Sequence, residues 1–141
     1  MTRFTEGKCS VSLPGPNERW ICISGSKFQK NHDNDKRLCD LSLLWDRDIA
    51  GMIAVALELK GGGASVEHVK EQLQGGANLL NELTDECNPT PFVPVLVHNR
   101  LSTMQMRRLA KVHVNFKGKR YPVKLLRCGK SVLEATEGLA A

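Results

Sequence analysis

The sequence has no long apolar run and few aromatic residues. Its most apolar stretch, residues 49–57, falls far short of the roughly 20 residues that span a bilayer. The opening MTRFTEGKCS also lacks the apolar centre of a signal peptide. We therefore expect a soluble, cytoplasmic protein. Aromatic residues make up 5% of the chain, which disfavours an RNA-binding sheet that stacks on bases.

Cysteines are also few and show no pattern. They are odd in number and include no C-x-x-C pair, and the four histidines are scattered, so neither a zinc site nor a disulfide scaffold is indicated. A cysteine–histidine protease would need a local motif that is missing. We expect reduced thiols, as in most cytoplasmic proteins. The five are Cys9, Cys22, Cys39, Cys87 and Cys128.

The chain does contain a block of positive charge. Its formal net charge is +5, and no acidic residue lies between Arg100 and Lys130. A segment of one sign suggests a polyanionic partner, with nucleic acid ahead of an anionic membrane surface. A solvated basic face without a partner would show the same pattern. The residues expected to contact nucleic acid are Arg107, Arg108, Lys111, Lys117, Lys119, Arg120 and Lys124.

Length and periodicity predict one mixed α+β domain. A chain of 141 residues suits a single core, here expected over about residues 20–98 with a basic extension over 99–130. The order of elements predicts a mixed central sheet flanked by helices. The predicted strands are 20–24, 39–45, 51–60 and 92–98, the helices are 65–83 and 102–110, and a hairpin joins 112–116 to 120–126.

The remaining segments are expected to be irregular. They are the opening up to residue 17, a polar loop at 25–37, a turn at 46–48 and the last ten or so residues. Ser65 is a suitable N-cap for the first helix, and Ser102 for the second. Gly75 and Gly76 interrupt the first helix, which indicates either that another part of the backbone packs closely there or that the helix bends.

Glu58 and Lys60 stand at the end of the most apolar predicted strand. Residues i and i+2 of a strand point to the same side, so the carboxylate and the ammonium emerge together. Burying them is costly unless they are paired or bind a cation. Asp40 begins the preceding strand, and antiparallel pairing would place it beside the end of the next. Two carboxylates and a lysine would then converge.

This combination suits phosphodiester hydrolysis. Two hard carboxylate ligands can hold Mg²⁺ or Mn²⁺. The ion would lower the pKa of a bound water and offset charge that develops on the phosphate. Lys60 could position the attacking water or stabilise the transition state.

The motifs resemble the PD-(D/E)XK nuclease superfamily of restriction-endonuclease-like and Holliday-junction-resolvase-like enzymes. The similarity is carried by CDLSLL at 39–44, LELKGG at 57–62 and HVKEQLQ at 68–74. It implies a restriction-endonuclease-like core in which Asp40 and Glu58, with the carbonyl of Leu59, hold the metal. The family lysine corresponds to Lys60.

The same resemblance extends to the helix, with some departures. Gln72, with Gln74 second, matches the family's supporting helix residue. Cys39 stands where the motif has proline. The family core begins with a helix that often supplies another acid, for which Glu18 and Glu6 are the only weak candidates here.

Other functions fit parts of the same pattern. A lone E-x-K can be a surface salt bridge, and the glycines from Gly61 do not complete a G-x-G-x-x-G or a P-loop. The main alternative is a non-catalytic nucleic-acid-binding or interaction domain; another is a defence effector nuclease that needs a partner protein. We expect DNA ahead of RNA, no membrane partner and, by resemblance, a homodimer.

Overall fold

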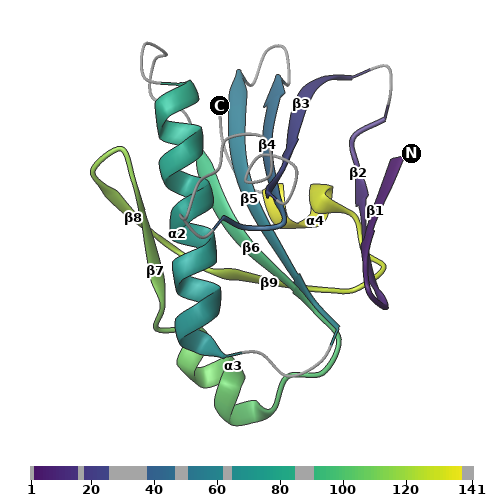
Figure 1. The fold of residues 1–141 in the computed structure, drawn as a ribbon, viewed down its shortest axis with the longest axis vertical. Coiled ribbons are helices and arrows are strands. Elements are labelled where there is room, and N and C mark those ends of the chain that lie inside the picture. Colours follow the sequence, from purple (N-terminus) through teal and green to yellow (C-terminus); the bar gives the residue numbers. More distant parts are fainter. Residues whose placement is uncertain are drawn as a thin grey trace.

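The structure, a computed structural model, describes residues 2–15, 18–25, 38–46, 51–61, 65–84 and 91–137. These residues form a mixed five-stranded sheet of order β3-β4-β5-β6-β9, two small hairpins and three helices (Figure 1). The elements are β1 (Thr2–Glu6), β2 (Cys9–Leu13), β3 (Arg19–Ser24), β4 (Leu41–Asp46), β5 (Met52–Lys60), α2 (Val66–Leu83), β6 (Phe92–His98), α3 (Thr103–Leu109), β7 (His113–Phe116), β8 (Lys119–Pro122), β9 (Lys124–Arg127) and α4 (Val132–Thr136).

The central sheet changes from antiparallel to parallel at β5. β3, β4 and β5 pair antiparallel, whereas β6 pairs parallel to β5 and β9 parallel to β6. The connection from β5 to β6 is made by α2, as parallel neighbours require a crossover. The carboxyl ends of β5, β6 and β9 therefore lie at one edge, beside the amino end of β4.

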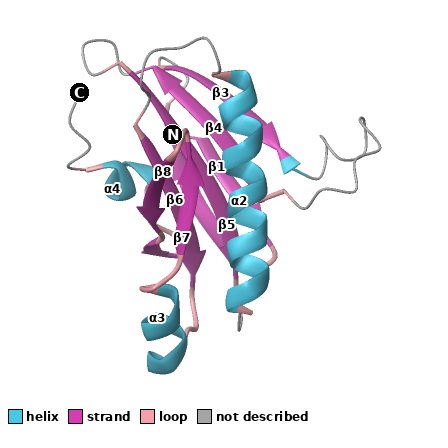
Figure 2. Cartoon of the chain, turned by 90° about the vertical axis from the view of Figure 1, so that its left-hand side faces the viewer, coloured by secondary structure: helices cyan, strands magenta, loops and turns pink. Residues whose placement is uncertain are grey.

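Each face of the sheet is covered by different elements (Figure 2). On one face, α2 buries its helical stripe of Val69, Leu73, Ala77 and Leu80 against the sheet. On the other face, β2 and α4 pack over the alternate side chains of β4, β5 and β6. The strand β5 is buried on both sides because it lies in the centre, with small alanines toward α2.

Both predicted helix caps are present. The Ser65 hydroxyl accepts a hydrogen bond from the backbone N of His68, and Ser102 forms a capping box with Gln105. Gly76 is where the close approach occurs: a Cβ at this position would collide with the Cys39 sulfur and press on Ala56. The strand predicted over 39–45 is also found, as β4, with Leu41, Leu43 and Trp45 in one core and Leu44 in the other.

The two ends of the chain depart from the predictions. The opening is not irregular, since β1 and β2 form a hairpin in which Val11 and Leu13 are buried. The segment 120–126 is two strands: β8 completes the β7 hairpin and β9 joins the central sheet, so the sheet extends beyond the expected core. The last residues are not all frayed, because α4 buries Val132 and Ala135.

The prediction of reduced thiols is wrong for two cysteines. Cys9 and Cys128 form a disulfide across a sequence separation of 119 residues. Of the other cysteines, Cys22 and Cys39 are free, and Cys87 lies outside the described residues. No spacing rule indicates a pairing between positions so far apart.

Some predictions fall on residues that the structure does not describe. They concern most of the loop at 25–37, part of the turn at 46–48 and the glycines Gly62 and Gly63. Within the described residues, no helix has both the length and the apolar character needed to cross a membrane.

Candidate active site

Asp40 and Glu58 meet where β4 begins and β5 ends. The backbone N of Asp40 donates to Glu58 Oε1 at 3.0 Å, and the backbone N of Leu59 donates to Asp40 Oδ2 at 2.9 Å. Each carboxylate is thus fixed by the backbone of the opposite strand. The structure brings these two acids together as the antiparallel register predicted.

Lys60 completes this cluster. Its Nζ lies 3.2 Å from Glu58 Oε2; the Lys60 side chain is 31% exposed and that of Glu58 only 1%. Burial, followed by the negative charge of Asp40, raises the pKa of Glu58 to about 7, against the lowering effect of Lys60. The lysine therefore compensates only part of the cost of a buried carboxylate.

Cys39, which precedes Asp40, and Gly76 on α2 determine how closely the helix packs at the site. Burial is the main cause that raises the pKa of Cys39 to about 12, so the thiol is neutral. Its sulfur lies 3.1 Å from the Leu41 carbonyl oxygen and 3.4 Å from the Ser42 hydroxyl. Because Gly76 has no side chain, α2 can lie directly on this thiol. Cys39 is thus a packing residue beside Asp40, in the place where the family motif has proline.

The two candidate glutamines have different surroundings. Gln74 exchanges two hydrogen bonds with the backbone of Asn115, at 2.8 and 2.9 Å, and so holds β7 against α2. Gln72 lies one turn before Gly76, and its Oε1 is buried without a hydrogen-bond partner. A buried carbonyl oxygen without a partner is uncommon and calls for a ligand or water. Of the two, Gln72 has an atom available for the site.

The donor set fits a divalent cation with oxygen preference. Asp40 and Glu58 supply carboxylates, and the Leu59 carbonyl projects to the same side of β5 as its N–H, toward Asp40. A cation would offset the repulsion that raises the pKa of Glu58. Within the described ranges, no group of three or more His, Cys, Asp or Glu side chains is placed to hold a metal. Glu6 and Glu18 are exposed and do not join the pair.

His98 is a residue of this edge that sequence reasoning did not select. It ends β6 in register with Lys60 on β5 and Arg127 on β9. It is 5% exposed, and its Nδ1 has no hydrogen-bond partner. Burial, followed by the charge of Arg127, lowers its pKa, so the imidazole is neutral at pH 7. The feature of the sequence that could have indicated His98 as a site residue is its position at the end of an apolar strand.

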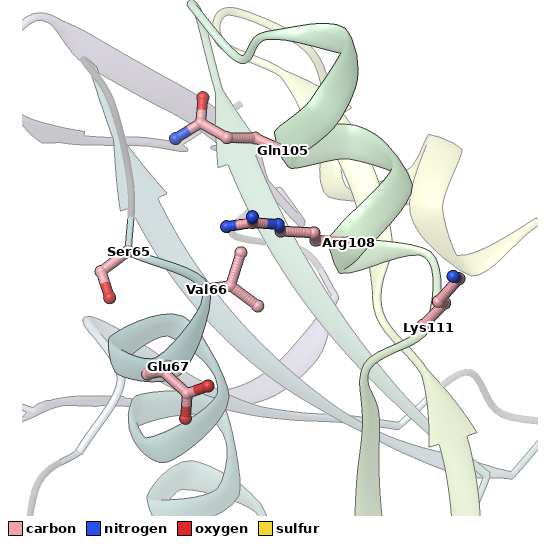
Figure 3. Close-up of a pocket in the computed structure, with 6 residues that line it drawn as sticks. All are labelled: Ser65, Val66, Glu67, Gln105, Arg108 and Lys111. Atoms are coloured by element: carbon pink, nitrogen blue, oxygen red, sulfur yellow. The ribbon is translucent and has the colours of Figure 1, made fainter.

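A pocket of about 470 Å³ lies between the start of α2 and α3 (Figure 3). Because α2 follows β5 and α3 follows β6, both helices start at the strand-end edge that carries the acids. In Figure 3, Gln105 and Arg108 extend from α3 toward Ser65 and Val66 at the start of α2. The lining residues are Ser65, Val66, Glu67, Gln105, Arg108 and Lys111.

The structure divides the predicted basic segment into two regions. Arg108 and Lys111 line the pocket at the start of α2, and Arg107 is exposed on the same helix α3. Lys117 lies at the other end of α2, where its Nζ donates to the Thr84 carbonyl oxygen at 2.8 Å. α2 has 18 residues, so its ends are about 27 Å apart. On the hairpin side lie Lys119 and Arg120, which are exposed, while Lys124 begins β9.

We compared the chain with protein-family models, curated proteins and solved structures, and no match was found.

Proposed function

We propose that this protein is a metal-dependent nuclease with a restriction-endonuclease-like core. The observation that carries the proposal is the interlocked pair of Asp40 and Glu58 with Lys60 against it. Glu58 lies near the carboxyl end of β5, at the edge where open sheets commonly bind ligands, and Asp40 lies beside it at the start of β4. Mg²⁺ or Mn²⁺ would be held by the two carboxylates and the Leu59 carbonyl.

The residues have separate roles in the proposed reaction. The bound ion would supply a water of lowered pKa and neutralise charge on the phosphate. Glu58 is held rigid by the backbone of Asp40, so its oxygens need little reorganisation. Lys60 exchanges its contact with Glu58 for the attacking water or a phosphate oxygen, which are both acceptors for an ammonium. Gln72 Oε1 can accept a hydrogen bond from a water bound at the site.

The proposed substrate is DNA ahead of RNA. The basic residues of α3 lie at the same edge as the acids, so a bound phosphate backbone would pass over them. A homodimer and a cytoplasmic location remain predictions of the sequence alone. A defence nuclease that needs a partner protein would use the same residues.

A non-catalytic nucleic-acid-binding domain is the second candidate. It is favoured by one observation: Glu58 Oε2 is in contact with Lys60, and no third acid among the described residues joins the pair. In that case Glu58 and Lys60 are a buried structural ion pair. Removing either partner would then destabilise the fold without any catalytic consequence.

Metal-dependent cleavage distinguishes the two functions. We would incubate the wild type, Lys60→Ala and the matched surface variant Lys119→Ala with plasmid, linear duplex and single-stranded DNA, with Mg²⁺, Mn²⁺ or EDTA. We expect cutting by the wild type and Lys119→Ala only with metal, and none by Lys60→Ala. Undiminished cutting by folded Lys60→Ala would overturn the assignment. Salt-dependent DNA binding without cutting by any variant would favour the second candidate.

A further inference from the structure

The last residues of the three parallel strands β5, β6 and β9 lie side by side. Lys60 pairs in register with His98, and His98 with Arg127. Residues in register on parallel neighbours project to the same face, and side chains alternate along a strand. Glu58 and Leu96 lie on the α2 face, so Lys60, His98 and Arg127 project there too.

His98 carries a ring nitrogen that the fold leaves without a partner, and Arg127 lies beside it on β9. The His98 ring is almost fully buried, yet its Nδ1 has no hydrogen-bond partner. Arg127 is exposed and close enough to lower the pKa of His98 by its charge, in addition to burial. A neutral imidazole and a guanidinium side by side can both donate hydrogen bonds to one anion.

Charge changes sign along this edge. Asp40 and Glu58 stand at β4 and β5, and the side chains that follow toward β9 are neutral or cationic. Neighbouring strands are about 4.8 Å apart, so Arg127 lies on the order of 10 Å from the end of β5. This spacing leaves room for a metal-bound phosphate at β5 and a second phosphate beside it.

We propose that the ends of β6 and β9 form a subsite for the phosphate adjacent to the scissile one, with His98 and Arg127 as its binding residues. The inference rests on the proposed nuclease function and specifies its substrate class. The substrate is a polynucleotide with at least two consecutive phosphates. A small phosphodiester with a single phosphate occupies only the metal side.

A matched pair of substrates tests the subsite. We would measure kcat/KM for an oligonucleotide and for bis(p-nitrophenyl) phosphate, using the wild type, Arg127→Ala and the control Arg3→Ala, an exposed arginine on β1. Arg127→Ala should lower kcat/KM about tenfold for the oligonucleotide and leave the small diester unchanged. Equal losses on both substrates, or no loss beyond that of Arg3→Ala, would overturn the subsite while the nuclease stands.

Binding gives a reading that does not depend on cleavage. With Ca²⁺ in place of Mg²⁺, Arg127→Ala should lower the slope of log affinity against log salt by about one for a labelled oligonucleotide. His98→Phe keeps an aromatic ring, somewhat larger than imidazole, but removes both nitrogens, and should weaken binding while the melting temperature shows that the variant is folded. A slope for Arg127→Ala equal to that of Arg3→Ala would overturn the subsite while the nuclease proposal stands. If the wild type cuts neither substrate, the proposed function fails, and the subsite, which rests on it, fails with it.

Discussion

The two ends of helix α2 are both surrounded by basic residues but differ in what those residues do. At the first end, Arg108 and Lys111 line a pocket at the start of α2, on the same edge of the sheet as Asp40 and Glu58. At the second end, Lys117 caps the helix by donating to the Thr84 carbonyl and lies 5.5 Å from the centre of the Phe116 ring. The basic residues at the first end line a pocket near the candidate site, whereas Lys117 at the second end caps α2.

The difference shows that charge along a chain is a poor guide to charge in space. The ten lysines and arginines from Arg100 to Lys130 form one block in the sequence. The fold separates them, with Arg108 and Lys111 at the start of α2 and Lys117 at its other end, about 27 Å away. A carbonyl at a helix end attracts a cation for structural reasons, so Lys117 is a poor candidate for nucleic-acid contact.

The sharpest contrast between the two ends should be catalytic. Glu58→Ala removes a proposed metal ligand at the first end, and we expect cleavage to fall by roughly a thousandfold or more, since metal catalysis contributes several kcal/mol. Lys119→Ala at the second end should retain wild-type cleavage. Rates on plasmid DNA at saturating Mg²⁺ measure both. Comparable losses in the two variants would remove the distinction.

The ends also differ in how they are held. The strand-end edge is tied by the Cys9–Cys128 disulfide, whereas the hairpin is tied by hydrogen bonds. Closing a loop of this length stabilises by about 5 kcal/mol in the chain-entropy model. Cys9→Ser should therefore lower the free energy of unfolding by that order in urea titrations. The wild type and the variant should have different urea midpoints in oxidising buffer and similar ones in reducing buffer. Equal midpoints in oxidising buffer would contradict the prediction.

The pH dependence of stability should arise at the first end of α2, where Glu58 is buried. The pKa of Glu58 is raised from 4.5 to about 7, so the folded state binds more protons than the unfolded state between these values. Stability must then fall as pH rises from about 4.5 to about 7, by on the order of 3 kcal/mol. Subtracting the profile of Glu58→Gln from that of the wild type isolates this fall, and Mg²⁺ should reduce it. A flat difference would contradict the buried acid.

Nucleic-acid binding should respond to the first end more than to the second. The double variant Arg108→Ala/Lys111→Ala should weaken DNA binding about a hundredfold and lower the salt slope by about two. The control Lys119→Ala/Arg120→Ala makes the same change in charge on the hairpin and should have the smaller effect. Fluorescence anisotropy at several salt concentrations compares them. A larger loss in the hairpin variant would reverse the comparison.

The smallest effect should be structural. Lys117→Met retains much of the side-chain length but loses the hydrogen bond to Thr84, and should destabilise the protein by about 1 kcal/mol. DNA binding should not change. Thermal unfolding together with anisotropy checks both outcomes; lost affinity at wild-type stability would assign Lys117 to the nucleic-acid surface instead.

Local patterns predicted much of the central fold. The helix over 65–83 and its Ser65 cap are local features of the sequence, and both are present in α2. Asp40 and Glu58 could be placed together because consecutive antiparallel strands have a simple geometry. These predictions needed only neighbouring elements.

Contacts between distant segments could not be predicted in the same way. The register of His98 with Lys60 and Arg127 depends on parallel pairing across helices, and the Lys117 cap joins residues 33 apart. The first hairpin was missed because the alternation of Cys9, Val11 and Leu13 is only five residues long. β9 was merged with β8 because their separation at Val123 depends on which sheet each strand joins.

The Cys9–Cys128 bond also determines how the molecule would carry mechanical tension. When the chain is pulled from before Cys9 and from after Cys128, the force passes through the disulfide. The chain between the two cysteines, a sequence separation of 119, then bears none of the load. Once the bond is reduced, the same pull acts on the folded sheet, and full extension would release about 400 Å of chain. Reduction would thus convert a short, inextensible link into a long one.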